Sequence, residues 1–289
     1  MEYDLPTGYR PLRTLSERDG SWVYLAINSI GKHCCLKVQR VVDSESLTAL
    51  RGHRDRLPEI TSGEGFIPLV CHGAFPDQGI LWEELALADD SITGRPFDAA
   101  WADDYTPLTL ALRVAESGPA STTEVITQGL RLCRALAHLH RQSLYHRDVK
   151  PANVLVYQGR WVLGDYGSVG EAGATVEFPG TEGYVPPDGL GSPRLDVFAL
   201  GRSLYEAWTG LDRFQFPSLP PHVTRSEDWE THGWLLNHAL AHAANPLPSA
   251  RFQSAELLVE ALERARRGRK RWSRCGEGCA SRSRVKGDR

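Results

Sequence analysis

Hydrophobic and polar residues alternate, or gather in short apolar runs, along the first 85 residues of the chain. Turn-forming Gly, Asp and Asn residues separate these runs, which is typical of short β-strands. Between the third and fourth runs, the segment 44–57 places Leu47, Leu50 and Leu57 on one side of a helix. We therefore predict a β-rich segment with one helix. The predicted strands cover residues 9–15, 22–28, 33–38, 66–75 and 80–83.

From about residue 86 onward, the spacing of apolar residues indicates helices instead. The sequence Ser-Thr-Thr-Glu at 121–124 is a capping-box pattern that opens the first of them. Gly210 follows a strongly apolar segment and is expected to end its helix. A strand-rich part followed by a helical part is an α+β arrangement. The predicted helices cover residues 121–142, 196–208, 234–242 and 254–266, and a small hairpin joins 154–156 to 161–163.

The composition limits the class of protein. With 289 residues, 41% hydrophobic and 24% charged, the chain fits one large globular domain or two small ones. No run of about 18 apolar residues occurs, so we predict no transmembrane segment, and residues 1–10 lack the apolar core of a secretory signal. The six cysteines show no disulfide-framework spacing. We therefore expect a reduced, cytoplasmic protein.

The net charge of −3 conceals a basic C-terminal segment. Residues 264–289 contain eleven Lys or Arg and only two acidic residues. Because apolar residues are few, we expect 267–289 to be a disordered tail. Two interpretations stay open: a contact with an anionic partner, such as acidic lipid, nucleic acid or the acidic body of this protein, or a solvated linker.

Residues 88–107 differ from the segments on either side. They contain five aspartates among Gly, Pro and aromatic residues. We predict an irregular insertion there, which is either a partner-binding loop or an ordinary surface segment.

Two short segments carry the candidate chemistry. Residues 146–153 read His-Arg-Asp-Val-Lys-Pro-Ala-Asn, and residues 165–167 read Asp-Tyr-Gly. Asp148 and Lys150 can meet at one hydroxyl, while Asn153 and the aspartate of the second segment can share a divalent cation. Positioning and charge neutralisation of this kind are what phosphoryl transfer requires.

The two segments resemble the catalytic loop and the metal-binding loop of the protein kinases, whose pattern is His-Arg-Asp-x-x-x-x-Asn followed by Asp-Phe-Gly. The chain is most similar to bacterial-type Ser/Thr protein kinases. This resemblance implies a two-lobed α+β kinase fold over residues 9–266. Residues 9–85 would form a small lobe, with a five-stranded antiparallel sheet and one helix, and 86–266 a larger, mainly helical lobe. The insertion 88–107 would directly follow the hinge between them.

The resemblance also implies roles for individual residues. Asp148 would orient the attacking hydroxyl and accept its proton, and Lys150 would offset the charge that develops on the phosphoryl group. Asn153 and Asp165 would hold Mg²⁺ or Mn²⁺. Lys37 ends the sequence Cys-Cys-Leu-Lys and matches the lysine of Val-Ala-Ile-Lys, which holds the α- and β-phosphates of ATP.

The adenine site is expected at the hinge between the lobes. Glu83 and Leu85 would bind the nucleotide there, mostly through their backbone. Trp82 would close the pocket behind the adenine, or be an ordinary core aromatic, or both. Asp55 lies nearest to the expected acid partner of Lys37, although its short side chain leaves that ion pair unassigned.

The phosphate-covering loop departs from the family pattern. The family places three glycines in this loop, whereas residues 16–23 read Ser-Glu-Arg-Asp-Gly-Ser-Trp-Val, with only Gly20 nearby. Glycine allows backbone N–H groups to approach phosphate closely. This departure leaves weak nucleotide binding open: Arg18 could partly compensate for the missing glycines, whereas Glu17 and Asp19 would oppose phosphate binding.

The larger lobe shows further family features. Residues 180–188 resemble the loop that positions the protein substrate, in which Thr181 would contact Asp148 and Lys150. By the same resemblance, Asp188 would pair with Arg251, and Asp196 would brace the catalytic loop from beneath. The activation loop would span 168–179, with Ser168 and Thr175 as candidate phosphorylation sites.

Three functions are compatible with these residues. The first is an active Ser/Thr kinase that uses Mg-ATP on an unknown protein substrate and on itself. The second is a pseudokinase-like scaffold that binds nucleotide with little or no turnover. The third, less favoured, is a kinase for small molecules.

Overall fold

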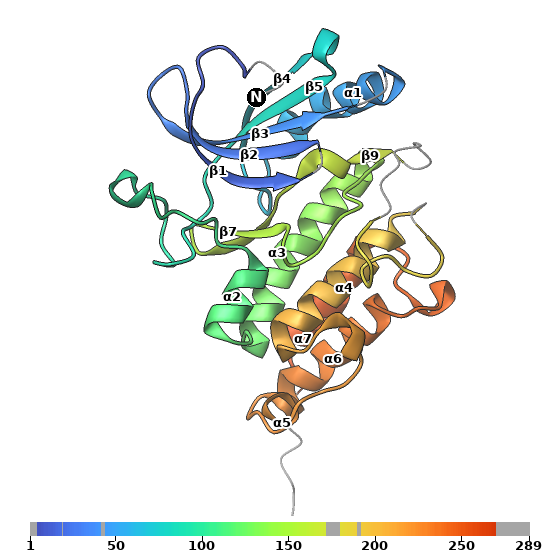
Figure 1. Cartoon of the computed structure of the whole chain (residues 1–289). Coiled ribbons are helices and arrows are strands. Elements are labelled where there is room, and N and C mark those ends of the chain that lie inside the picture. The colour runs from blue at the N-terminus through green and yellow to red at the C-terminus, as the bar shows by residue number, and fades with distance from the viewer. Residues whose placement is uncertain (1–4, 19, 42–43, 172–179, 190–191, 270–289) are drawn as a thin grey trace, which may run out of the picture.

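The computed structural model describes residues 5–18, 20–41, 44–171, 180–189 and 192–269, and it has two lobes (Figure 1). The smaller lobe is an antiparallel sheet of five strands in the order β1-β2-β3-β5-β4, with the helix α1 beside β4 and β5. The predicted α+β fold and the five-stranded sheet with one helix are therefore confirmed. These elements are β1 Arg10–Arg18, β2 Ser21–Ile27, β3 His33–Arg40, α1 Ser44–Ile60, β4 Leu69–Phe75 and β5 Ile80–Leu85.

Side chains of strand β5 are buried on both faces of this sheet, on the outer face and on the face that contacts α1. Ile80 belongs to an outer cluster with residues of β2 and β3, whereas the next residue, Leu81, packs against Leu47 of α1. Each of Ile80 and Leu81 is 1% exposed. Successive residues of a strand point to opposite faces, so β5 is apolar on both sides at its start.

The larger lobe is mainly helical and lies below the sheet in Figure 1. Its first helix, α2, is absent from the sequence predictions, since eight residues give too short a pattern. The predicted helices and hairpin lie close to their expected ranges, as α3 Thr122–Arg141, β7 Val154–Tyr157, β8 Arg160–Leu163, α4 Arg194–Thr209, α6 Trp234–Ala243 and α7 Ala255–Arg267. Besides α2 Leu110–Ser117, three short elements were not predicted, namely β6 Leu144–Tyr145, β9 Gly170–Glu171 and α5 Pro221–Thr224.

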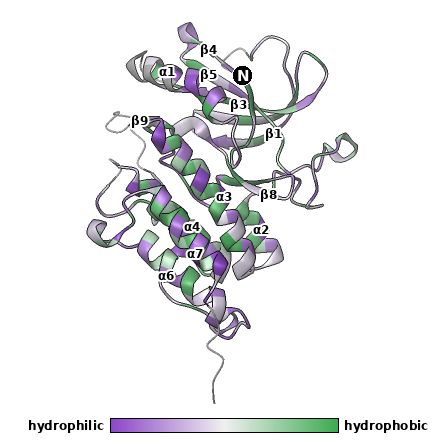
Figure 2. Ribbon diagram, turned by 180° about the vertical axis from the view of Figure 1, so that it is seen from behind, coloured by the Kyte–Doolittle hydropathy of each residue, from purple (hydrophilic) through white to green (hydrophobic). Residues whose placement is uncertain are grey.

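Helix α3 is the centre of the larger lobe and carries the chain to the catalytic segment. The Ser121 hydroxyl accepts a hydrogen bond of 3.2 Å from the Glu124 N–H at its start, as the capping pattern predicts. Glu124 does not complete the box but pairs with Arg113 of α2 at 2.8 Å. Hydrophobic and hydrophilic residues alternate in bands along α3 (Figure 2), as expected for a helix with one buried side.

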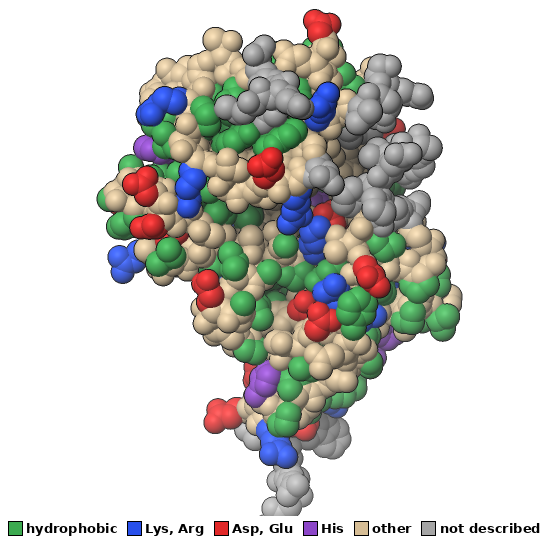
Figure 3. All heavy atoms as spheres, in the orientation of Figure 1, with side chains coloured by type: hydrophobic (Ala, Val, Ile, Leu, Met, Phe, Trp, Pro, Cys, Tyr) green, Lys and Arg blue, Asp and Glu red, His purple; other side chains and the backbone are tan. Residues whose placement is uncertain are grey.

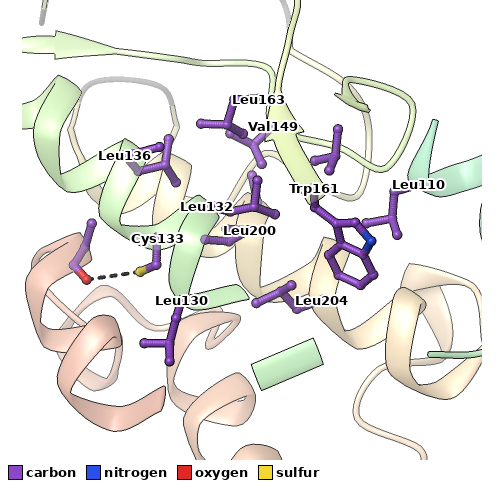
Figure 4. Close-up of a cluster of buried hydrophobic side chains, with 14 of the residues drawn as sticks. Leu110, Leu130, Leu132, Cys133, Leu136, Val149, Trp161, Leu163, Leu200 and Leu204 are labelled. Carbon is purple, nitrogen blue, oxygen red and sulfur yellow. Dashed lines mark hydrogen bonds between the residues drawn. The ribbon is translucent and has the colours of Figure 1, made fainter. Parts of the chain in front are cut away.

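The buried side of α3 forms the main hydrophobic core together with β8, α4 and α7 (Figure 4). Leu132 and Leu136 of α3 and Leu200 of α4 are fully buried there. Cys133 donates a hydrogen bond of 3.2 Å to the carbonyl of Ala255 at the start of α7. This core fixes both ends of the catalytic segment, which lies between α3 and β7.

The aspartates at the start of the 88–107 insertion hold the backbone in place. Asp89 accepts hydrogen bonds of 2.8 Å from the N–H groups of Gln158 and Gly159 in the β7–β8 turn. Asp90 accepts one of 3.1 Å from the Thr106 N–H, which closes the insertion on itself. These two aspartates therefore have a structural role.

Candidate active site

The catalytic segment 146–153 is held from beneath by Asp196, the third residue of α4. The Asp196 carboxylate accepts hydrogen bonds of 2.8 Å from the backbone N–H groups of both His146 and Arg147. Its Oδ2 also lies 2.8 Å from Nε2 of His140 on α3. Burial opposes the charge, yet these partners outweigh it and lower the pKa of Asp196. The predicted bracing of this loop by Asp196 is thus confirmed.

Asp148 is enclosed by three polar partners. Thr181 donates a hydrogen bond of 2.9 Å to its Oδ1, and Lys150 donates one of 2.7 Å to its Oδ2. Lys150 also donates one of 2.8 Å to the Thr181 hydroxyl, so the predicted contacts of Thr181 are confirmed. The Asn153 amide nitrogen donates to Oδ2 at 2.7 Å. The Asp148 carboxylate is therefore buried and has a fixed orientation.

Asp165 and Lys37 meet at the inner end of the cleft. Asp165 follows β8 in a left-handed conformation, with φ of 58°, and its Oδ1 forms an ion pair with Nζ of Lys37. Burial opposes both charges, but the pair outweighs it: the pKa of Asp165 is lowered and that of Lys37 is raised. A Cβ at Gly167 would lie 3.1 Å from Lys37 Nζ, so a larger residue there would press on this ion pair.

A cavity of about 340 Å³ lies between the lobes and contains most of the predicted nucleotide-binding residues. Lys37, Leu85, Asn153 and Asp165 line it. Figure 3 shows Lys and Arg side chains gathered at one end of the hollow between the lobes. Further lining residues that the sequence predictions did not include are Cys35, Ile67, Ala86, Ala88, Tyr105 and Leu155.

Some of these could have been found in the sequence. Leu155 follows Asn153 by two residues on β7, and alternation directs it away from the buried Val154 and Val156. Cys35 stands two residues before Lys37 on β3, so both face the cavity. Burial raises the pKa of the Cys35 thiol to about 12, so it is not a reactive group.

Gly20 and Glu83 do not line this cavity. Gly20 lies in the turn between β1 and β2 with φ of 72°, and its carbonyl accepts a hydrogen bond of 2.7 Å from the Arg40 N–H. The Glu83 side chain is 1% exposed and faces Arg54 of α1. Glu83 nevertheless lies next to the site, because it is the cross-strand partner of Lys37 on β3.

The segment expected to cover the phosphates is a tight hairpin. β1 continues to Arg18 and β2 begins at Ser21, and Ser16 already pairs with Val23. Backbone groups in this paired stretch are used between the strands rather than free to face a ligand. The side chain of Arg18 instead contributes to the wall of the 340 Å³ cavity.

Arg18 also lines a second cavity of about 460 Å³ on the other side of the catalytic segment. Lys150, Thr181 and Glu206 contribute to that wall. Burial raises the pKa of Glu206, and the Tyr184 hydroxyl donates a hydrogen bond to it. Arg18 and the residues around Lys150 therefore stand between the two cavities.

The structure corrects the prediction that Trp82 closes the pocket. Trp82 points to the outer face of the sheet, where its ring packs 5.6 Å from that of Tyr9. The next residue, Glu83, points inward. The prediction was wrong by one residue, and a one-residue shift reverses the face of every side chain in a strand.

Other predicted pairs have clear outcomes. Asp55 is exposed and lies 3.9 Å from His72, so it is not the partner of Lys37. The Asp188–Arg251 pair is confirmed at 2.8 Å, and it lowers the pKa of Asp188 despite partial burial. Ser168 is only 6% exposed, and Thr175 lies outside the described residues.

Asn153 and Asp165 are compatible with a divalent cation. The amide nitrogen of Asn153 is occupied by Asp148, which leaves the amide oxygen as its ligand atom. Asp165 adds a carboxylate in the same cavity. Oxygen donors of these two types suit Mg²⁺ and Mn²⁺.

Comparison with known proteins agrees with this geometry. The sequence family "Protein kinase domain" matches residues 104–240. Serine/threonine-protein kinase D of Synechocystis is 30% identical over 166 residues, which are 51% of this chain and 32% of that protein. Serine/threonine-protein kinase PknL of Mycobacterium tuberculosis is 37% identical over 112 residues, 35% of this chain and 28% of that protein. The chain therefore spans about a third or less of the length of these relatives.

A solved structure extends the similarity to both lobes. The PknI kinase domain of M. tuberculosis matches with a TM-score of 0.58 over 90% of this chain and 96% of that chain. The sequences are 22% identical over this match, so it establishes the fold and not the activity.

Proposed function

Because this chain has the protein kinase fold and is homologous to bacterial Ser/Thr protein kinases, we propose that it is an ATP-dependent protein kinase. It would transfer the γ-phosphate to Ser or Thr hydroxyls, including its own. The observation that carries the proposal is the hydrogen-bonded group of Asp148, Lys150 and Thr181, which Asn153 connects to the cavity lined by Lys37 and Asp165.

In this proposal the catalytic segment handles the acceptor hydroxyl. Asp148 orients the hydroxyl and accepts its proton, because its carboxylate is fixed by hydrogen bonds from Thr181 and Lys150. Lys150 keeps a positive charge beside the transferring group and offsets its developing negative charge. Thr181 sets the relative position of the two.

The inner residues handle the nucleotide. Lys37 binds the α- and β-phosphates, and Asn153 and Asp165 would hold Mg²⁺ or Mn²⁺, which supplies positive charge to the phosphates. The adenine ring would lie between Cys35 and Leu155, against the backbone of Leu85. Arg18 adds a cation where the family loop would offer backbone N–H groups.

Other parts of the proposal concern partners. The protein substrate would occupy the 460 Å³ cavity beside Lys150 and Thr181. The described part of the chain contains no helix that is both long and apolar enough to cross a membrane. Residues 270–289 of the basic tail lie outside the described residues, and its anionic contact stays a prediction, as does the cytoplasmic location.

The test compares wild-type protein with Asp148→Asn. Both are incubated with γ-labelled ATP and Mg²⁺ or Mn²⁺, modified residues are found by mass spectrometry, and nucleotide affinity is measured by calorimetry. We expect label on Ser or Thr in the wild type only, with similar nucleotide affinity in both proteins. Equal labelling of the two would contradict the role of Asp148.

The same experiment separates the alternatives. Binding without transfer would favour a scaffold, a function for which the glycine-poor β1–β2 hairpin is the supporting observation. Phosphorylation of a small molecule without any protein acceptor would favour the third function. Absence of both binding and transfer would contradict the kinase proposal.

A further inference from the structure

Helix α1 presents a base, not an acid, to the interior of the smaller lobe. Nε of Arg54 lies 2.9 Å from Oε1 of Glu83 on β5. The two side chains are 3% and 1% exposed, which makes this the least exposed pair of opposite charges between Lys or Arg and Asp or Glu in the described part of the chain. Burying two charges is unfavourable unless each has a partner, so a buried pair at this position requires an explanation.

Glu83 has a second cationic neighbour besides Arg54, namely Lys37. Lys37 lies directly opposite Glu83 on β3. Cross-strand partners point to the same face of a sheet, with Cβ atoms about 4.5–5.5 Å apart, so Glu83 lies beside Lys37, whose Nζ forms its ion pair with Asp165. Lys37 therefore has two acidic neighbours, one on β5 and one after β8.

Arg54 also connects α1 to the rest of the site. It donates a hydrogen bond of 2.7 Å to Oε1 of Gln39, two residues beyond Lys37 on β3. A Cβ placed on Gly167 would lie 3.1 Å from that same oxygen. Arg54 thus connects α1 to the strand of Lys37, at a glutamine whose side chain lies close to Gly167.

We propose that Glu83 positions Lys37 for the nucleotide phosphates, and that Arg54 of α1 holds Glu83 in place. The usual pairing is thereby reversed, with the acid on β5 and the base on the helix. This proposal rests on the proposed kinase function, and it makes Glu83 and Arg54 positioning residues that act through Lys37.

The first test is nucleotide affinity, measured by calorimetry with Mg-ADP. Glu83→Gln is expected to weaken binding by roughly 10- to 100-fold, the range known for residues that orient metal ligands. Its matched control is Glu84→Gln, at another buried glutamate one residue later, which faces Tyr9 and Asn28 on the outer side of the sheet. Wild-type affinity in Glu83→Gln would overturn the proposal.

The second test separates positioning from mere structural pairing. The exchange Arg54→Glu with Glu83→Arg keeps a buried ion pair but places a second cation opposite Lys37. We expect the double variant to unfold at a higher urea concentration than either single variant, close to that of the wild type. Its nucleotide affinity is expected to stay as low as in Glu83→Gln. Recovery of both would mean that the pair is only structural. Arg51→Met, an exposed change on the same helix, should alter neither quantity.

A third measurement needs neither nucleotide nor turnover. Lys37→Met and Glu83→Gln are combined in a double-mutant cycle, with stability read from urea unfolding. Non-additive effects are expected if the two side chains interact, and additive effects would overturn the proposal. Failure of the wild-type protein to transfer phosphate would contradict only the kinase function. The double-mutant cycle would still measure the interaction between Lys37 and Glu83, because it is read from stability.

Discussion

Thr181 donates a hydrogen bond of 2.9 Å to Asp148 across 33 residues of sequence. The same hydroxyl accepts one of 2.8 Å from Lys150. A single side chain of the substrate-side loop therefore links the two residues that would act on the acceptor hydroxyl.

Replacing Thr181 by Val tests this link. The change keeps the volume but removes both hydrogen bonds, each worth about 1.5–3 kcal/mol because one partner is charged. We expect kcat to fall roughly tenfold or more with little change in the KM for ATP, since the nucleotide cavity is untouched. Steady-state kinetics on a peptide substrate measures both constants. Thr181→Ser keeps the hydroxyl and should retain most activity; equal loss in both variants would contradict the link.

Arg18→Ala tests the replacement of the missing glycines. Arg18 lines both cavities, so its removal should weaken ATP binding about tenfold, or about 1.4 kcal/mol. Adenosine, which has no phosphates, should bind as before. Arg10→Ala, an exposed change at the other end of β1, serves as the control. Parallel weakening of ATP and adenosine would show that Arg18 does not act on the phosphates.

Asp196→Asn should change how stability depends on pH. The pKa of Asp196 is lowered in the folded protein, so its contribution is complete above its ordinary pKa of about 3.9 and is lost as pH falls through the folded value. At pH 7 the variant should be less stable by about 1.5–3 kcal/mol, as for a hydrogen bond to a charged group.

Urea unfolding at several pH values measures this difference. It should stay constant from pH 7 to about pH 5 and shrink below about pH 4. A gap that is independent of pH down to acid unfolding would mean that the Asp196 charge does not contribute.

Gly73→Ala tests the orientation of Trp82. A Cβ at Gly73 would lie 2.6 Å from Cζ2 of the Trp82 ring. Such overpacking typically destabilises a protein by about 1–3 kcal/mol. Thermal unfolding should show this loss, and Trp82→Leu should relieve it. Nucleotide affinity should not change, because Trp82 faces away from the cleft. A large change in affinity would contradict this orientation and indicate that Trp82 contacts the nucleotide pocket.

The catalytic segment could be predicted because it is local. Asp148, Lys150 and Asn153 lie within six residues, and Asp165 follows after one short hairpin. Their relative positions depend on a few turns, which the sequence specifies. The partners of Asp196 and Arg251 were also predicted, although only through resemblance to a family.

The side chains of β5 could not be predicted in the same way. A strand that is apolar on one side reveals its orientation, whereas Ile80 and Leu81 are buried on opposite faces. The pattern therefore gave no reason to prefer one register, and Trp82 was placed where Glu83 lies.

Arg54 was missed although the sequence contains a signal for it. It follows Leu47 by seven residues and precedes Leu57 by three, so all three lie on one side of α1. Leu47 and Leu57 are buried, and so is Arg54. A charged residue on an apolar stripe indicates a buried partner of opposite charge.

The buried pair behind Lys37 also restricts which synthetic inhibitors would fit the cleft. A compound with an apolar group directed past Leu85 towards α1 would meet a carboxylate and a guanidinium instead of an apolar slot. Separating them would leave each charge buried alone, at a cost of roughly 3–5 kcal/mol. Selective compounds are therefore expected to stay in the outer part of the cavity and to discriminate through contacts with Cys35 and Arg18.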